Sequence, residues 1–230
     1  MSDSFLKTRN RLEIYFDQTA AKAWEALTAD SPVSGIRARV RAGRDMMRKE
    51  LLALLPEDLR GARVLDAGCG AGQIALELGE RGAEVLGVDI SKSLISVAEK
   101  RLPINLKDNI EYKVGDMLSK EHGSFDYVIS MDSLIHYEGV DIARSLSKLS
   151  ERTKEKIVFT IAPRTLLLST LLFLGKVFPR SDRSPQIAPI SFSDLCNNVD
   201  KMNNLKSENL RLVNRIKSSF YVSEALVLEL

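Results

Sequence analysis

A short apolar run at residues 64–65 ends in an acid and is then broken by three glycines at alternate positions, giving the series Asp66, Gly68, Gly70 and Gly72. The run predicts a buried parallel strand, and the glycines predict a turn whose backbone a ligand can approach closely. Residues 73–79 carry apolar side chains at helical spacing, so the turn leads into a helix N-terminus with unpaired N–H groups. Strand, glycine turn and helix in this order predict a nucleotide-binding loop.

The spacing of this loop separates two classes of nucleotide-binding protein. The dinucleotide fingerprint G-x-G-x-x-G would need glycine at position 73, where the chain has Gln73. The pattern D-x-G-x-G-x-G instead resembles motif I of the class I S-adenosylmethionine-dependent methyltransferases, in which the acid lies near the methionine amino group. A chance glycine cluster is the alternative. A second acid, Asp89, ends the next apolar run 17 positions after Gly72 (89 − 72), where it can accept both ribose hydroxyls.

Composition limits the class of protein. With 230 residues, a net charge of +2 and 28% charged residues, we expect one domain and no nucleic-acid partner. The two cysteines, Cys69 and Cys196, make neither a disulfide framework nor a metal cluster, and they suit a reducing cytoplasm. Residues 1–4 contain no apolar signal-peptide core, and no stretch reaches the roughly 18 apolar residues of a membrane span. We therefore expect a cytoplasmic protein with no metal site of its own.

Strand-like and helix-like patterns alternate along the middle of the chain. Further strands are predicted at 83–89, 110–117, 124–131 and 156–162, with helices at 91–101 and 142–149. This rhythm is typical of an α/β fold with a doubly wound, Rossmann-like, mostly parallel sheet. Alternation at 210–213 and again at 221–228 indicates a C-terminal antiparallel hairpin.

The two ends of the chain depart from this rhythm. Helices are predicted at residues 5–30 and from residue 36 to Leu55, before Pro56. We expect residues 1–56 to form a helical cap and residues 57–230 to form the core, with a lid insertion around 163–205. The Asn-rich stretch 197–209 is predicted to be a surface excursion.

Two segments each allow more than one role. Residues 36–44 hold four arginines, which form either a solvated helix face or a surface that binds carboxylates. Residues 166–174 are apolar almost throughout, and core burial, a lid over a flat apolar ligand, and contact with a membrane surface all remain open.

Outside motif I, several stretches are similar to one family, the magnesium-protoporphyrin IX O-methyltransferases. They are Tyr15, Phe16 and Trp24, RARVRAGR at 37–44, DSLIHY at 132–137, FPRSDRSP at 178–185 and SFY at 219–221. The resemblance extends over nearly the whole chain. Two departures limit it: members from oxygenic phototrophs tend to carry a tyrosine where this chain has Thr28, so no catalytic tyrosine is expected there, and the Asn-rich stretch is unlike the family.

The resemblance implies transfer of a methyl group from S-adenosylmethionine to a propionate carboxylate of magnesium protoporphyrin IX, giving the monomethyl ester of (bacterio)chlorophyll biosynthesis. The alternatives are a methyltransferase of another small apolar acid or a quinone, a cofactor-binding regulator without turnover, and a porphyrin carrier. The magnesium belongs to the substrate. Magnesium chelatase is a candidate porphyrin donor, and peripheral contact with the photosynthetic membrane is left open.

The resemblance also implies a division of the site residues. The expected cofactor-binding residues come from the loop, the strand ends and the arginine segment: Asp66, Gly68, Gly70, Gly72, Asp89, Ile90, Asp116, Met117, Met131 and Arg41. The expected substrate-binding residues are Arg37, Arg44, Tyr137, Arg180 and Arg183.

His136 is the best candidate for a residue near the reacting carboxylate, because it is one of only two histidines and follows the fourth strand, whose end would face the cofactor. A propionic acid titrates near 4.3, so the substrate is already an anion at neutral pH and needs alignment more than a strong base. His136 could orient the carboxylate by a hydrogen bond or take a residual proton. A histidine that only packs under the cofactor is the alternative. Tyr15 is a second catalytic candidate, and His122 is predicted to have no role.

Overall fold

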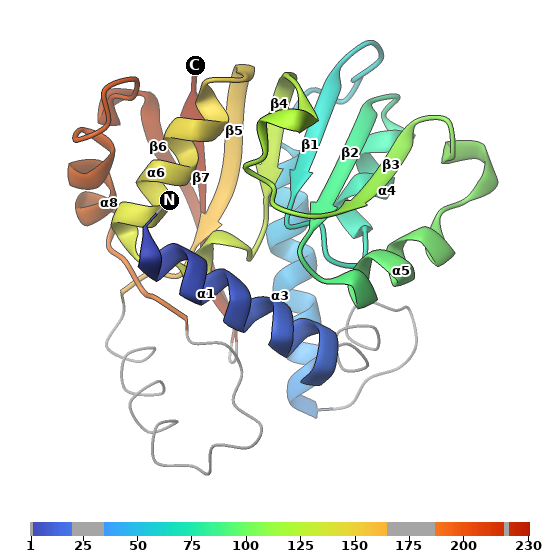
Figure 1. The fold of residues 1–230 in the computed structure, drawn as a ribbon, viewed down its shortest axis with the longest axis horizontal. Helices are drawn as coiled ribbons and strands as arrows, with labels where there is room; N and C mark the ends of the chain where they lie inside the picture. Colours follow the sequence, from blue (N-terminus) through green and yellow to red (C-terminus); the bar gives the residue numbers. More distant parts are fainter. Residues whose placement is uncertain (1, 20–34, 165–186, 219–220) are drawn as a thin grey trace.

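The computed structural model describes residues 2–19, 35–164, 187–218 and 221–230 (Figure 1). One seven-stranded sheet has the order β3-β2-β1-β4-β5-β7-β6. The five strands β3, β2, β1, β4 and β5 are parallel, and β7 runs antiparallel to both β5 and β6. The predicted doubly wound sheet with a C-terminal hairpin is therefore confirmed. The strands are β1 Arg63–Ala67, β2 Glu84–Asp89, β3 Ile110–Val114, β4 Phe125–Ser130, β5 Thr153–Ile161, β6 Leu210–Ser218 and β7 Tyr221–Glu229.

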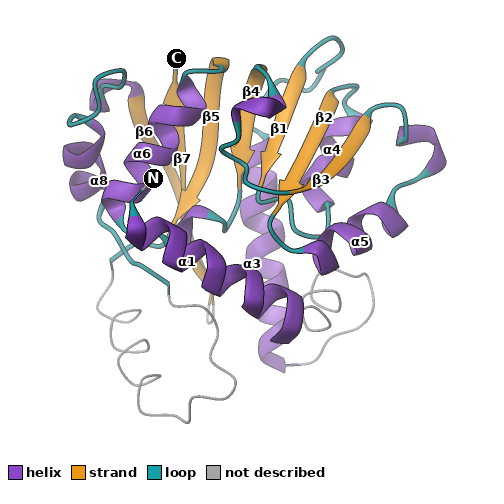
Figure 2. Cartoon of the chain, in the orientation of Figure 1, coloured by secondary structure: helices purple, strands orange, loops and turns teal. Residues whose placement is uncertain are grey.

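Helices cover both faces of the sheet (Figure 2). In the view of Figure 1, α1 and α6 lie in front of the sheet and α3 lies behind it. The α-helices are α1 Asp3–Ile14, α3 Gly35–Leu52, α4 Gln73–Glu80, α5 Lys92–Arg101, α6 Gly139–Ser150 and α8 Phe192–Val199, and a π-helical turn, Tyr15–Thr19, continues α1. Short 3₁₀ turns occupy Ile104–Leu106, Lys120–His122, Leu134–His136 and Ser207–Asn209.

The central strands are buried on both faces because neighbouring residues point into different cores. Val64 packs with α3 and α4 side chains such as Met47 and Leu78. Leu65 packs on the opposite face with side chains from α1 and α6, including Phe5 and Leu146. Apolar residues at successive positions of one strand thus satisfy two separate cores, as parallel sheets require.

Several predicted boundaries move. The helix expected to reach Leu55 ends at Leu52, and the strand expected to reach residue 117 ends at Val114. Buried side chains of α3 share a core with the strands, so this helix is integral to the α/β layer, and a domain boundary at residue 56 stays a prediction.

The region predicted as a lid insertion includes a core helix. Leu195 and Val199 of α8 are fully buried, and Leu205 nearby is 3% exposed, which means that the stretch 197–209 is only partly a surface excursion. The apolar run 166–174, Arg180 and Arg183 lie outside the described residues. Among the residues that are described, no helix is long and apolar enough to cross a membrane.

Candidate active site

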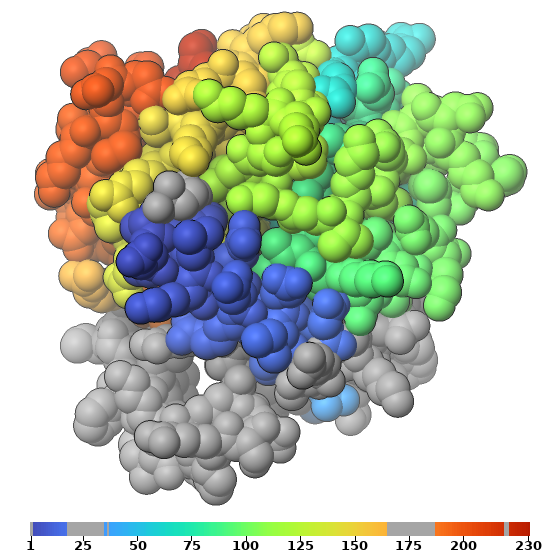
Figure 3. Space-filling view, in the orientation of Figure 1, coloured from blue at the N-terminus to red at the C-terminus, as the bar shows by residue number. Residues whose placement is uncertain are grey.

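A pocket lies at the carboxyl ends of the parallel strands, under the N-terminal helix. Its walls come from the loops after β1, β2, β3 and β4 and from the inner face of α1. Figure 3 shows α1, in blue, lying across this face of the molecule against the green loops. Of the predicted residues, the pocket is lined by Asp66, Gly68, Gly70, Asp89, Ile90, Asp116, Met117, Met131, Arg44, His136 and Tyr137.

The glycine loop takes a conformation that other residues would not tolerate. Gly68 has φ +81°, and a Cβ added there would lie 2.4 Å from the Ser133 hydroxyl. Gly72 also has φ +81°; it precedes α4 as the N-cap residue and abuts the Tyr112 hydroxyl, but it does not line the pocket. These backbone angles lie in the left-handed region, which glycine enters without penalty. The loop is therefore fixed in a form that exposes backbone to a ligand.

Asp66 is a buried acid, and one of its carboxyl oxygens is an unsatisfied hydrogen-bond acceptor. Asp66 is 1% exposed, and its Oδ2 has no hydrogen-bond partner among the residues that the structure describes. Burial, reinforced by the charge of Asp89 and opposed by the N–H of Ala75, raises the pKa of Asp66 to about 8. A buried carboxyl oxygen without a partner is costly, so this position suits a ligand that brings a cationic donor.

Asp89 connects the end of β2 to the glycine loop. Its carboxylate accepts the N–H of Gly70 at 2.9 Å and the N–H of Ser91 at 2.8 Å. Burial raises the pKa of Asp89 although both N–H groups act in the other direction. The sequence predicted an acid at a strand tip, and the structure adds that the same carboxylate holds the loop in place.

The turn after β3 carries Asp116 and Met117 and is anchored from several sides. Asp116 accepts the N–H of Leu118 at 2.9 Å and pairs with Arg9 of α1 at 3.2 Å. The Arg152 guanidinium donates to the carbonyl oxygens of Met117 and Ser119. His122, predicted to have no role, places Nε2 2.9 Å from the Asp116 carbonyl oxygen and so helps to hold the turn.

His136 ends the 3₁₀ turn after β4, Tyr137 follows it directly, and both residues line the pocket. The ring of His136 meets Phe16 edge to face, with centroids 6.3 Å apart. Tyr137 is 5% exposed and stacks on Phe5 at 4.5 Å. Burial, with nearby Asp116, raises the pKa of the Tyr137 phenol, so it stays protonated.

Helix α1 is tied down at both ends. The hydroxyls of Ser2 and Ser4 donate to Asp141 at 2.6 and 2.8 Å. At the other end, Asp17 accepts the Ser91 hydroxyl at 2.7 Å and the N–H of Ser93 at 3.0 Å, at the start of α5. No local sequence pattern predicts these contacts, because each joins segments far apart in the chain.

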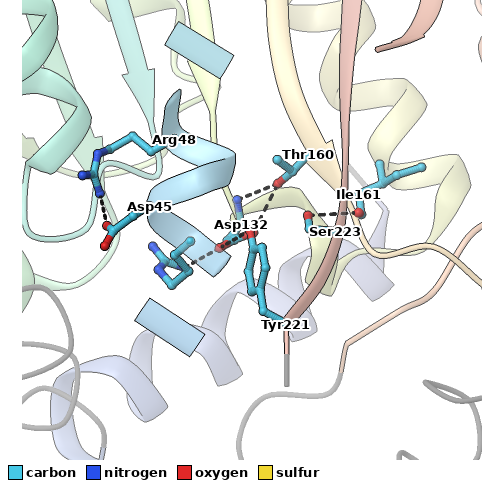
Figure 4. Close-up of polar contacts among 8 residues, drawn as sticks. Asp45, Arg48, Asp132, Thr160, Ile161, Tyr221 and Ser223 are labelled. Atoms are coloured by element: carbon cyan, nitrogen blue, oxygen red, sulfur yellow. Dashed lines mark hydrogen bonds and ion pairs between the residues drawn. The ribbon is translucent and has the colours of Figure 1, made fainter. Parts of the chain in front are cut away.

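Asp132, which sequence reasoning missed, joins three elements at the pocket wall (Figure 4). Its carboxylate accepts the Tyr221 hydroxyl of β7 at 2.9 and 3.2 Å and pairs with Arg44 of α3. Its N–H donates to the Thr160 hydroxyl of β5 at 2.7 Å. It is also the one described residue other than glycine with a positive φ, +54°. Asp132 begins the DSLIHY segment of the family resemblance, but no local pattern assigns this acid a role.

The arginine segment only partly meets expectation. Arg44 lines the pocket, and Arg48, one turn further on, does so as well while bonding Asp45 and Glu77. Arg37 and Arg41 do not line it, although they share a helix face with Arg44. The reason is axial distance for Arg37, which lies seven residues from Arg44 and so about 10 Å further along the helix.

Tyr15 is also outside the pocket lining, whereas Phe16 is part of it. The two rings touch edge to face at 5.2 Å. They lie at the start of the π-helical turn, whose wider spacing changes which side chains face inward. The structure therefore does not bring Tyr15 to the site as a catalytic residue.

A family model described as methyltransferase domain matches residues 64–156, and one described as magnesium-protoporphyrin IX methyltransferase C-terminus matches residues 130–229. The magnesium-protoporphyrin O-methyltransferase of Rhodobacter capsulatus is 47% identical over 227 residues, 98% of each chain. The chain belongs to the magnesium-protoporphyrin O-methyltransferase family. The Synechocystis protein of the same name is 30% identical over 182 residues, 78% of this chain and 79% of that one.

A solved structure shows the same fold. The magnesium protoporphyrin IX methyltransferase ChlM of Synechocystis, with bound SAH, matches at a TM-score of 0.81 and 24% identity, covering 96% of this chain and 99% of that one. In this methyltransferase-family chain, the match to the general methyltransferase domain contains Asp66 and Asp89. The match to the family-specific C-terminal model contains His136 and Tyr221.

The cofactor of this family is S-adenosylmethionine, and the pocket fits it on two observations. The unpartnered oxygen of Asp66 suits a protonated amino group, and the glycine loop leaves backbone open beside it. Asp89 can still accept hydrogen bonds from ligand hydroxyls in addition to its two N–H bonds, since a carboxylate has about four lone-pair positions.

Proposed function

We propose that this chain transfers a methyl group from S-adenosylmethionine to one propionate carboxylate of magnesium protoporphyrin IX, giving the monomethyl ester of (bacterio)chlorophyll biosynthesis. The observation that carries the proposal is the 47% identity, over 98% of both chains, to a relative of that name. The chemistry is carboxyl O-methylation, which the pocket can support without a metal ligand set.

The cofactor side of the pocket is assigned as follows. Asp66 binds the amino group, and Asp89 binds the ribose hydroxyls while it holds Gly70. The turn at Asp116 and Met117 flanks the adenine, and the side chains of Ile90 and Met131 form apolar walls. When bound, the cofactor supplies an electrophilic methyl group on a sulfonium centre.

The substrate side needs orientation and the exclusion of water. A propionate is ionised near neutral pH, so the chain must align an existing nucleophile. His136 donates a hydrogen bond that orients the carboxylate, with Arg44 and Tyr137 on the same walls. The side chains Phe5, Leu12 and Phe16 of the N-terminal helix keep water from the reacting groups.

One assay tests the function. Purified protein is incubated with labelled S-adenosylmethionine and magnesium protoporphyrin IX, and the ester is resolved by chromatography. Metal-free protoporphyrin and a quinone-type phenol serve as comparison substrates, because ubiquinone biosynthesis O-methyltransferases match 53% of the chain at 29–30% identity. Ester formed preferentially from the magnesium porphyrin supports the proposal. Methylation of the phenol alone, or of nothing, contradicts it.

The proposal also covers the source of the porphyrin and the place of the protein in the cell. The sequence has a basic, proline-bounded stretch at 179–185 and an apolar run at 166–174, a combination that suits an anionic membrane surface. We place the protein in the cytoplasm, at the periphery of the photosynthetic membrane, with magnesium chelatase as porphyrin donor. Sedimentation with anionic vesicles and porphyrin transfer from purified chelatase test the two points separately.

A further inference from the structure

Asp132 carries three features that an ordinary loop acid does not combine. It adopts φ +54°, a conformation that costs most side chains energy and that Asp and Asn tolerate best. Its side chain is 7% exposed. It faces the same pocket as Arg44, to which it is paired. Strain of this kind at a pocket wall points to a local task.

The contacts of Asp132 hold its carboxylate in one position beside the Arg44 guanidinium. Thr160, which is fully buried in β5, holds its backbone, and the Tyr221 hydroxyl spans both carboxylate oxygens. Tyr221 is itself pressed against α3, since a Cβ on Gly43 would come within 2.8 Å of the Tyr221 ring. The carboxylate is therefore aimed at Arg44 from the sheet side and cannot follow the guanidinium if it swings away.

We propose that Asp132 and Tyr221 are positioning residues, which hold the Arg44 guanidinium at the pocket wall in the orientation that receives a ligand carboxylate. This inference rests on the proposed function, in which Arg44 faces a carboxylate. An arginine side chain has many rotamers, and fixing it beforehand reduces the entropy lost when a ligand binds. Its planar guanidinium matches a carboxylate only in a narrow range of orientations, so its direction matters as much as its charge.

The carboxylate has two possible sources, the methionine end of the cofactor and a propionate of the porphyrin. The shared chemistry is a carboxylate against a fixed guanidinium. Binding of S-adenosylhomocysteine, which has the carboxylate, and of 5′-methylthioadenosine, which lacks it, measures the first source. Binding of magnesium protoporphyrin IX, followed by its absorption band, measures the second.

The test uses the full-length protein and the variants Asp132→Asn, Tyr221→Phe and Arg44→Ala. Asn keeps the backbone angle accessible and removes one negative charge from the wall. If Asp132 acted only through charge, Asp132→Asn would bind carboxylate ligands more tightly and Tyr221→Phe would change nothing. Positioning predicts the opposite sign: weaker binding by about tenfold for Asp132→Asn and about two- to tenfold for Tyr221→Phe. Tyr127→Phe on β4 and Arg39→Ala on the exposed face of α3 are matched controls.

A double variant tests whether the effect of Asp132 depends on Arg44. In the Arg44→Ala background, Asp132→Asn should cause no further loss, because its effect passes through the arginine. Weaker binding of the porphyrin with unchanged S-adenosylhomocysteine binding assigns the guanidinium to the propionate. Weaker S-adenosylhomocysteine binding with unchanged 5′-methylthioadenosine binding assigns it to the cofactor. Tighter or unchanged binding of all three ligands in both variants, or additive effects with Arg44→Ala, overturns the inference. A wild-type protein that forms no ester overturns the proposed function instead, and the S-adenosylhomocysteine arm still decides the positioning role.

Discussion

Phe16 and His136 meet edge to face with ring centroids 6.3 Å apart, which brings the end of the N-terminal helix against the candidate catalytic residue. One ring comes from the π-helical turn after α1 and the other from the 3₁₀ turn after β4. The aromatic contact restricts the imidazole plane. The orientation of His136 therefore depends on the helix that covers the pocket.

Replacing His136 by alanine should lower kcat and kcat/KM together, by about 10²–10⁴-fold, if it orients or protonates the carboxylate in the transition state. Binding of S-adenosylhomocysteine, measured by calorimetry, should stay close to wild type. His136→Asn should recover part of the rate if hydrogen bonding is the role, and almost none if proton transfer is. A packing histidine would instead weaken cofactor binding and lower Tm, with a rate within a few-fold of wild type.

Replacing Asp89 by alanine should weaken S-adenosylhomocysteine binding by tenfold or more. The substitution removes acceptors from the ribose and also leaves the N–H groups of Gly70 and Ser91 without their partner. Each unsatisfied donor costs about 1–3 kcal/mol, so Tm should fall as well. Calorimetry and thermal unfolding measure the two effects. Wild-type affinity would remove Asp89 from the cofactor site, and Asp126→Asn, at the far end of β4, is a control for a lost strand-end acid.

Cofactor binding should depend on pH through Asp66. Its pKa is raised to about 8, so below that value the free protein holds a proton that must leave before a cationic amino group can bind. Affinity for S-adenosylhomocysteine should rise between about pH 6 and about pH 7.5, by at most tenfold per pH unit. Calorimetry in two buffers of different ionisation enthalpy should detect proton release. Binding of 5′-methylthioadenosine should be flat over the same range, and a flat S-adenosylhomocysteine profile would contradict the assignment.

The raised pKa of Asp66 also makes the free energy of unfolding depend on pH. A carboxyl whose folded pKa lies above its unfolded value of 3.8 binds more protons when folded. Its contribution to the free energy of unfolding therefore falls as pH rises from about 4 to about 8. Asp66→Asn should reduce that slope in denaturant titrations of the ligand-free protein.

Replacing Arg152 by methionine should loosen the turn that carries Asp116 and Met117. The guanidinium is half-buried and donates to the carbonyl oxygens of Met117 and Ser119, which would lose these bonds. S-Adenosylhomocysteine and 5′-methylthioadenosine should both bind about 5- to 50-fold more weakly, because the change is felt at the adenosine end. Arg211→Met, at an exposed arginine of β6, is the control. A loss confined to S-adenosylhomocysteine would show that this turn does not contact adenosine.

Most strands and helices could be predicted because their signals are local. The strand that contains Asp66, the glycine turn and the helix from Gln73 follow from apolar spacing and from glycine's freedom at positive φ. The acids Asp66, Asp89 and Asp116 line one pocket, because parallel strands bring their carboxyl ends to one edge of a sheet. Tyr15 and Arg37 do not line the pocket, because helical phase and length decide which side chains reach it, and their roles stay predictions.

The sequence by itself determined the sheet, the loop and the family resemblance, since each rests on a pattern within a few neighbouring residues or on similarity along the chain. Only the tertiary structure decided which arginines of α3 line the pocket, that Phe16 and not Tyr15 lines it, and that Asp132 joins α3, β5 and β7. These outcomes depend on contacts between residues far apart in the chain. No local spacing encodes them, because they arise only when helices and strands pack at one particular depth and rotation.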